Sequence, residues 1–218
     1  MKIFLDSTDT AEVKELFKTN LINGVTTNPS LIAKSGRQPD DIYSELQDIG
    51  IPDISMEVVG SYDVMLEEAL RLKDKFGDCC TIKLPMSEEG LLLCEYLDRQ
   101  HMDIRTNVTT IFTAAQALLA ARCGANYISP FIGRLDDQQV PGLEVVRIIQ
   151  NMLCAQNLKG GTRVVAASIR DVRSVISCAV AGVPIVTVPP KVFRDMYKSQ
   201  LTDAALAQFD QAFSAYSN

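Results

Sequence analysis

Short apolar runs alternate with helical segments along almost the whole chain, and this alternation constrains the fold more than any other feature. The apolar runs, which we interpret as strands, cover residues 3–6, 24–27, 54–58, 81–84, 104–108, 127–129, 164–167 and 185–188. The helical segments that follow them cover residues 13–19, a stretch ending at 46, 64–76, 90–97, 111–122, 145–153, 172–181 and 193–197. Eight such units are the number that closes a parallel (β/α)8 barrel.

An open, doubly wound sheet is the structural alternative. Against it, no glycine-rich GxGxxG run follows the first strand, where Asp6-Ser7-Thr8 stands instead. No linker rich in proline, glycine or serine divides the 218 residues, so we expect residues 1–218 to form a single barrel domain. A last amphipathic segment, residues 201–216, falls outside the eight units and predicts an additional C-terminal helix.

Charge and composition narrow the possible functions. The net charge of −6, without clustered lysine or arginine, argues against nucleic-acid binding. The first residues reach an acid too early for a signal peptide and no apolar run is long enough to span a bilayer, so we expect a cytoplasmic protein without membrane contact. With one histidine, His101, and six cysteines outside any metal-ligand spacing, acid–base work is expected to fall to carboxylates, lysine or water.

Lys83 lies near the end of an apolar run that otherwise resembles a buried strand. An ammonium removed from water tends to lose its charge, and an uncharged amine is a good nucleophile toward a carbonyl carbon. This predicts Schiff-base chemistry. The alternative is a lysine whose stem covers apolar surface while its head reaches water.

Polar residues stand at the ends of seven of the predicted strands. Active sites of (β/α)8 barrels lie where the strands end, so we expect these side chains to converge on one mouth. Loop capping or solvation is the alternative for each one taken singly. The residues are Asp6, Thr26, Asn28, Glu57, Lys83, Asn107, Thr109, Ser129, Arg134, Ser168 and Arg170.

Five motifs at these strand ends resemble those of the transaldolases, in the family's order and over nearly the whole chain. The short length is similar to the compact branch that also contains the fructose-6-phosphate aldolases. The motifs are GVTTNPS at residues 24–30, IKLP at 82–85, NVT at 107–109 with AQA at 115–117, ISPFIGR at 128–134 and AASIR at 166–170.

The resemblance implies transfer of a dihydroxyacetone unit between sugar phosphates, without a metal or an organic cofactor. Donors would be sedoheptulose 7-phosphate or fructose 6-phosphate, and acceptors glyceraldehyde 3-phosphate or erythrose 4-phosphate, in the non-oxidative pentose phosphate pathway. Related aldolases typically have glutamine and tyrosine where this chain has Glu57 and Phe131. This pair favours transaldolase over the alternative, fructose-6-phosphate aldolase; a non-catalytic phosphate-binding barrel is the third hypothesis.

Roles for the catalytic residues also come from the resemblance. Lys83 would form the Schiff base, Asp6 would accept and return the proton of the sugar hydroxyl, and Glu57 with Thr109 would hold the proton-shuttling water. Asn28 and Asn107 would bond substrate hydroxyls or orient the lysine.

Substrate binding completes the roles that the resemblance implies. Thr26, Ser129 and Phe131 would support the substrate site, and Arg134, Ser168 and Arg170 would bind phosphate. A helix start near Asp171 and two guanidinium groups suit an anion there. The compact branch also forms rings of five subunits, sometimes stacked in pairs, so a pentamer or decamer is expected.

Overall fold

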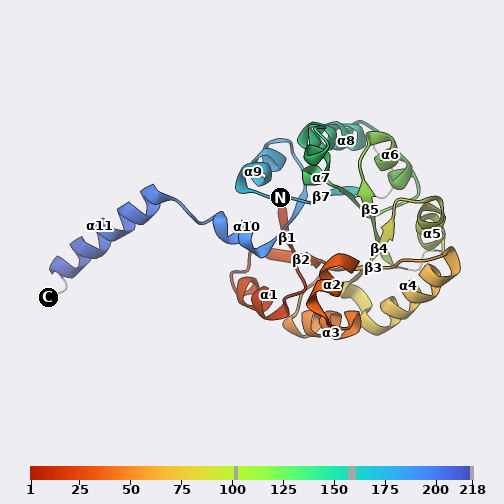
Figure 1. The fold of residues 1–218 in the computed structure, drawn as a ribbon, viewed down its shortest axis with the longest axis horizontal. Coiled ribbons are helices and arrows are strands. Elements are labelled where there is room, and N and C mark those ends of the chain that lie inside the picture. Colours follow the sequence, from red (N-terminus) through yellow and green to blue (C-terminus); the bar gives the residue numbers. More distant parts are fainter. Residues whose placement is uncertain (101–102, 157–160, 217–218) are drawn as a thin grey trace.

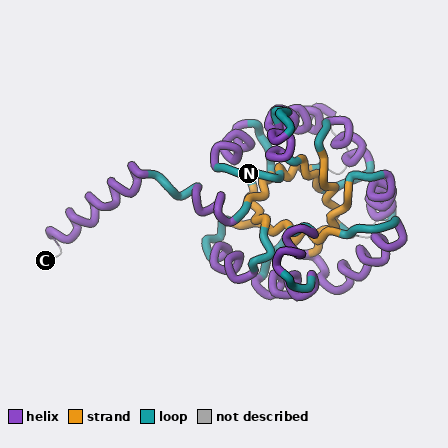
Figure 2. The backbone as a smooth tube through the Cα atoms, viewed as in Figure 1, coloured by secondary structure: helices purple, strands orange, loops and turns teal. Residues whose placement is uncertain are grey.

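The chain folds into a closed ring of parallel strands surrounded by helices (Figures 1 and 2). The computed structural model describes residues 1–100, 103–156 and 161–216, and His101 lies outside the described residues. Every strand pairs with the next along the chain, and β1 (Lys2–Asp6) also pairs with β8 (Ile185–Val188). This confirms the predicted (β/α)8 barrel.

The strands and helices of the barrel follow one another in chain order. The remaining strands are β2 (Ile22–Thr26), β3 (Ile54–Glu57), β4 (Cys80–Pro85), β5 (Arg105–Ile111), β6 (Tyr127–Pro130) and β7 (Arg163–Ala166). The helices are α1 (Thr10–Phe17), α2 (Pro29–Ser35), α3 (Pro39–Ile49), α4 (Tyr62–Phe76), a 3₁₀ turn η1 (Gly77–Cys79), α5 (Glu88–Arg99), α6 (Ala114–Arg122), α7 (Ile132–Asp137), α8 (Gly142–Gln156), α9 (Val172–Val180), α10 (Pro190–Asp195) and α11 (Gln200–Tyr216).

The boundary between β5 and α6 differs from the prediction. A helix starting at residue 111 is wrong, because the strand continues through Ile111 and the helix begins at Ala114. Thr113 caps that helix in a reciprocal box with Gln116, whose side chain bonds the Thr113 backbone. The cap fixes where the helix starts and lets the β-branched residues before it remain in the strand.

The second unit contains two helices rather than one continuous stretch. Helix α2 ends at Gly36, whose φ of 66° is a left-handed conformation that suits glycine. Pro39 then opens α3 in the first turn, where its missing N–H costs no hydrogen bond. The short α2 thereby lies directly after the strand end of β2, next to the mouth of the barrel.

A small aromatic and aliphatic cluster from β1, β6, β7 and β8 lies inside the barrel and forms part of its floor. The rings of Phe4 and Tyr127 meet edge to face, with centroids 6.3 Å apart. Burial and the neighbouring Asp53 raise the pKa of Tyr127 to about 12, and its hydroxyl donates to Asp53 over 2.8 Å. The cluster consists of Phe4, Tyr127, Val165 and Ile185.

Strand geometry links this floor to the cavity above it. Side chains two positions apart on a strand point to the same face. Two positions beyond the four floor residues, each strand therefore presents an inward-facing residue one layer higher. Those residues are Asp6, Ser129, Ala167 and Thr187, and all four line the cavity described below.

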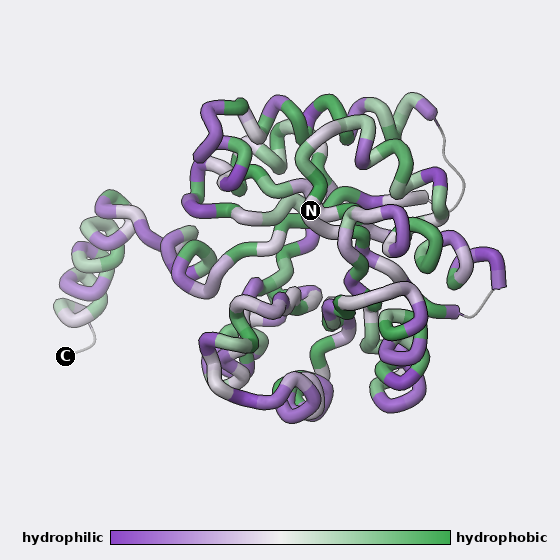
Figure 3. Tube along the Cα trace, turned by 45° about the vertical axis from the view of Figure 1, so that its right-hand side comes forward, coloured by the Kyte–Doolittle hydropathy of each residue, from purple (hydrophilic) through white to green (hydrophobic). Residues whose placement is uncertain are grey.

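Helix α11 stands away from the barrel (Figure 1) and has no buried residue. Hydrophobic and hydrophilic positions alternate along it (Figure 3), and Phe209 and Phe213 are 67% and 59% exposed. This is the predicted additional C-terminal helix. None of the described helices is long and apolar enough to cross a membrane.

Candidate active site

A cavity of about 320 Å³ opens at the carboxyl ends of the strands. Most of the predicted site residues line it, although they come from six different strands and the loops that follow them. Asn107, Thr109 and Arg170 do not line it. The predicted residues that do are Asp6, Thr26, Asn28, Glu57, Lys83, Ser129, Phe131, Arg134 and Ser168.

Lys83 lies on β4 with only 4% of its surface exposed. Its Nζ atom is 2.8 Å from Glu57 Oε2 and donates to the backbone oxygen of Thr27 over 3.0 Å. The pairing follows from strand register, since Glu57 on β3 stands directly beside Lys83. An uncharged amine is expected from the sequence, whereas the structure places a carboxylate within ion-pair distance. Both partners are nearly buried, so this pair is screened little by solvent.

Asp6, at the end of β1, lines the same cavity beside Thr26. The Thr26 hydroxyl donates to Asp6 Oδ1 over 2.8 Å and also lies 2.7 Å from the hydroxyl of Thr187 on β8. Burial raises the pKa of Asp6, while the Thr26 hydrogen bond and the charge of Lys83 act in the opposite direction. A carboxyl poised in this way is suited to proton transfer.

Asn107 lies beside Lys83 in the register of β4 and β5, within the barrel and outside the cavity. It accepts a hydrogen bond of 2.7 Å from the hydroxyl of Ser129, which does line the cavity. Its amide donates to Ser55 over 3.3 Å. Asn107 therefore fixes the position of the Ser129 side chain from outside the cavity.

The end of β5 departs from regular strand geometry at Thr109 and Thr110. The pairing of β5 with β6 shifts register between Val108 and Ile111, and Thr110 adopts a φ of 56°. That is a strained value for a β-branched residue. As a result Thr110 lines the cavity, while the Thr109 hydroxyl is buried without a hydrogen-bond partner in the described part of the chain.

Arg134, on α7, supplies the cavity with a cation besides Lys83. Its guanidinium lies over the ring of Phe131, 5.0 Å from the ring centroid, in a cation–π arrangement. It makes no salt bridge with any acidic residue that the structure describes. An anionic group in the cavity can therefore bind Arg134 without displacing a carboxylate.

Ser168 and Arg170 follow β7, beside α7. Ser168 has a left-handed φ of 58° and lines the cavity. A Cβ atom on Gly133 would meet the Ser168 backbone oxygen at 2.5 Å and Arg170 Nε at 2.6 Å, so glycine is what allows this close approach. Arg170 itself pairs through both terminal nitrogens with Asp137, outside the cavity.

Two cavity residues lie outside both the predicted site residues and the five motifs, Thr110 and Thr187. Both stand within or next to β-branched runs that have the composition of an ordinary buried strand. Thr187 is identifiable from its place in the last strand only once the barrel register is known. Thr110 has no sequence signal, because nothing local marks the change of register.

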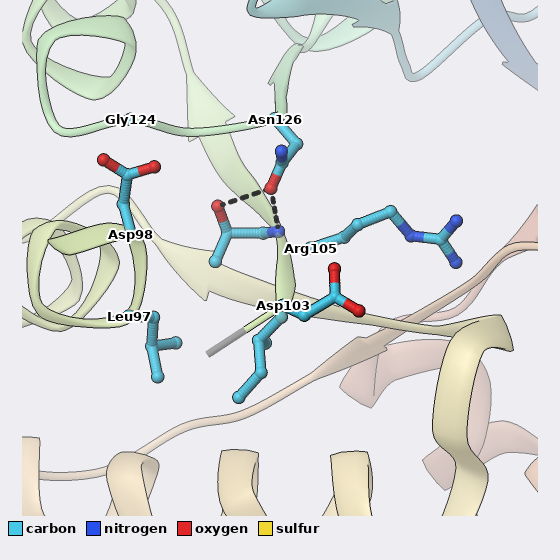
Figure 4. A pocket seen from close by; sticks show the side chains of 8 residues that line it. Leu97, Asp98, Asp103, Arg105, Gly124 and Asn126 are labelled. Atoms are coloured by element: carbon cyan, nitrogen blue, oxygen red, sulfur yellow. Dashed lines mark hydrogen bonds between the residues drawn. The ribbon is translucent and has the colours of Figure 1, made fainter. Parts of the chain in front are cut away.

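Figure 4 shows a second cavity, of about 330 Å³. It is bordered by the start of β5 and by residues preceding β6, so it lies where the strands begin, at the opposite end of the barrel. The side-chain oxygen Oδ1 of Asn126 already accepts a hydrogen bond from the backbone N–H of Thr106 over 2.8 Å. None of the described residues that line this cavity is a lysine, so it is not the candidate site.

Fold and site together define a (β/α)8-barrel protein with a buried lysine, two carboxyl groups and an arginine around one mouth, and no acidic residue among those described pairs with that arginine. The chain matches the model of the transaldolase/fructose-6-phosphate aldolase family over residues 3–218, and it belongs to that family.

Three relatives named as probable transaldolases come from different bacteria. The protein from Caulobacter vibrioides is 45% identical over 96% of this chain and 94% of its own length. The Hyphomonas neptunium protein is 44% identical over 96% of this chain and 95% of its own. One from Clostridium botulinum strain Hall is 44% identical over 96% and 94%, respectively.

Proposed function

We propose that this protein is a transaldolase that carries a dihydroxyacetone unit as a Schiff base on Lys83. The observation that carries the proposal is the buried Lys83–Glu57 pair, 2.8 Å apart, in one cavity with Asp6 and Arg134. Family membership and the names of the relatives support the same activity.

The first half of the reaction makes and breaks bonds on the donor. Lys83 must lose a proton before it attacks, and Glu57 is the neighbouring carboxylate that accepts it. The amine then adds to the ketone carbon of a ketose phosphate, and loss of water gives an iminium ion. The C3–C4 bond breaks toward this electron sink as Asp6 takes the proton of the C4 hydroxyl. An aldose phosphate leaves.

The second half runs the same steps in reverse with another aldehyde. The enamine on Lys83 attacks the carbonyl carbon of the acceptor, and Asp6 returns its proton to the new hydroxyl. Water then hydrolyses the imine and frees the new ketose phosphate.

In this proposal Glu57 and Thr109 hold the water that shuttles protons. Thr109 lies outside the cavity lining, but its buried hydroxyl has no hydrogen-bond partner among the described residues and so keeps the capacity to bind one water. Asn28 lines the cavity and bonds substrate hydroxyls, whereas Asn107 acts through Ser129.

Phosphate is bound by Arg134 together with Ser168. Both line the cavity, and the guanidinium is free of a carboxylate partner in the described part of the chain. Arg170 takes part only if the phosphate displaces Asp137 from it. We assign sedoheptulose 7-phosphate or fructose 6-phosphate as donors, glyceraldehyde 3-phosphate or erythrose 4-phosphate as acceptors, and a cytoplasmic place in the non-oxidative pentose phosphate pathway.

Fructose-6-phosphate aldolase is the second candidate, and Phe131 argues against it. The ring lines the cavity and packs on Phe112 with centroids 5.8 Å apart. It offers no hydroxyl to help water protonate the enamine, so the enamine persists until an aldehyde arrives. The third candidate, a non-catalytic phosphate-binding barrel, requires that ketose forms no covalent bond with Lys83.

Release of glyceraldehyde 3-phosphate from fructose 6-phosphate separates these activities. We expect release to depend on erythrose 4-phosphate, with at least about tenfold less without it, since water must otherwise protonate the enamine. Phe131→Tyr is the matched variant, because it adds only the hydroxyl, and acceptor-independent release should rise in it. Equal release with and without acceptor in the wild type would assign the aldolase activity instead.

We further propose a homo-oligomer, a pentamer or decamer, in which α11 packs on a neighbouring subunit. The helix buries nothing on its own barrel and exposes Leu201, Phe209 and Tyr216. Sedimentation velocity should give a species larger than the monomer, and replacing Phe209 and Phe213 with serine should shift it toward monomer. A wild type that sediments only as monomer contradicts the assembly.

A further inference from the structure

Thr187 belongs to a short chain of side-chain oxygens that ends on Asp6. It lies on β8, is 3% exposed and lines the cavity. Its hydroxyl is 2.7 Å from that of Thr26, which donates to Asp6 over 2.8 Å. Strand β1 pairs with both β2 and β8, so Thr26 and Thr187 come from the two strands that flank Asp6.

The number of protons in this chain fixes the direction of its hydrogen bonds. The Thr26 hydroxyl carries one hydrogen, and it is used toward the Asp6 carboxylate. Toward Thr187 it can therefore only accept, so Thr187 is the donor while Asp6 is ionised. A proton on the other carboxyl oxygen of Asp6, Oδ2, leaves this order in place, whereas a proton on Oδ1 reverses it: Asp6 then donates to Thr26, and Thr26 donates to Thr187.

We propose that Thr187 is a positioning residue that keeps the Thr26 hydroxyl aligned on Asp6 in both protonation states of the carboxyl. Proton transfer to and from Asp6 then requires only rotation of hydroxyl hydrogens and no movement of a side chain. This rests on the proposed function, which uses Asp6 as the acid and base.

Thr187 is uncharged, so substituting it tests this role without altering the charged groups around Asp6. Lys83 on β4 and Glu57 on β3 act on Asp6 through their charges, while Thr26 on β2 and Asn28, the N-cap of α2, are uncharged. From β8 only the Thr187 hydroxyl joins the chain. Removing that hydroxyl leaves every charge near Asp6 unchanged.

Thr187→Val removes the hydroxyl at nearly constant shape. We expect kcat to fall about three- to tenfold, the size expected for one buried hydrogen bond, with KM for donor and acceptor unchanged. The ionised form of Asp6 loses support, so the acidic limb of the kcat–pH profile should move to higher pH. Thr187→Ser keeps the hydroxyl and should recover most of the lost rate.

A measurement without turnover keeps this test separate from that of the proposed function. The ¹³C carboxyl signal of Asp6, assigned by its loss in Asp6→Asn, should titrate at higher pH in Thr187→Val than in wild type or Thr187→Ser. An inactive wild type with this shift would overturn only the proposed function. An unshifted signal, or a serine variant that titrates like the valine variant, would overturn the role of Thr187; thermal melting checks that all variants fold.

Discussion

Replacing Lys83 with methionine should abolish activity, lowering kcat by at least about 10⁴-fold, because the covalent route disappears entirely. Methionine has a similar length and no charge, so it fills the space of the lysine in a nearly buried position. The measurement is acceptor-dependent turnover, together with sodium borohydride trapping of the imine formed with fructose 6-phosphate and intact-mass spectrometry. Wild type should gain one mass increment and the variant none.

Lys191 provides the matched control for this experiment. Its side chain is 84% exposed, forms a surface ion pair with Asp195 and does not line the cavity. Lys191→Met should be trapped and turn over like wild type. A trapped adduct in the Lys83 variant would mean that another amine carries the substrate.

The second large effect is expected at Asp6. Asp6→Asn should lower kcat by about 10²- to 10⁴-fold, since an amide cannot accept the proton of the sugar hydroxyl. Imine formation precedes that step, so borohydride should still trap the donor on Lys83. Loss of trapping along with turnover would place Asp6 in Schiff-base formation instead of bond cleavage.

The Asp6→Asn substitution that lowers kcat should at the same time make the folded protein more stable. Burial raises the folded-state pKa of Asp6 above its ordinary 3.8, so folding favours the protonated carboxyl. The stabilisation of the folded protein by the protonated carboxyl is complete at pH values below the pKa of Asp6 in the unfolded chain. It is lost as the pH rises through the pKa of Asp6 in the folded protein. At neutral pH the buried carboxylate therefore opposes folding. Asp6→Asn should melt at a higher temperature than wild type at pH 7, with the difference shrinking in acid.

Most of the fold was predictable because its signals are local and repeated. Alternating apolar strands and helices predicted the barrel, and glycine, proline and threonine signals explain where helices stop and start. The error at Ile111 has a physical cause: β5 and the predicted helix share β-branched and apolar residues, and only the cap at Thr113 separates them. Cap geometry depends on side-chain hydrogen bonds that composition does not specify.

The candidate site, like the fold, was only partly predictable from the sequence. Polar residues at regular strand ends, such as Lys83 and Glu57, were predictable because closing the barrel brings strand ends together. Thr110 was not, since a shift of register decides which residue faces inward. Side-chain pairs between different elements were not predictable either, since no sequence pattern indicates that Arg170 pairs with Asp137.

The floor residues Phe4, Tyr127, Val165 and Ile185 lie inside the barrel beneath the site. In the proposed reaction, substrates and products therefore enter and leave through the open end of the cavity. The aldose phosphate released from the donor must vacate the phosphate site before the acceptor binds there, while the three-carbon unit stays bound to Lys83. Donor and acceptor then bind in turn, which predicts ping-pong kinetics for reasons of access as well as of imine chemistry.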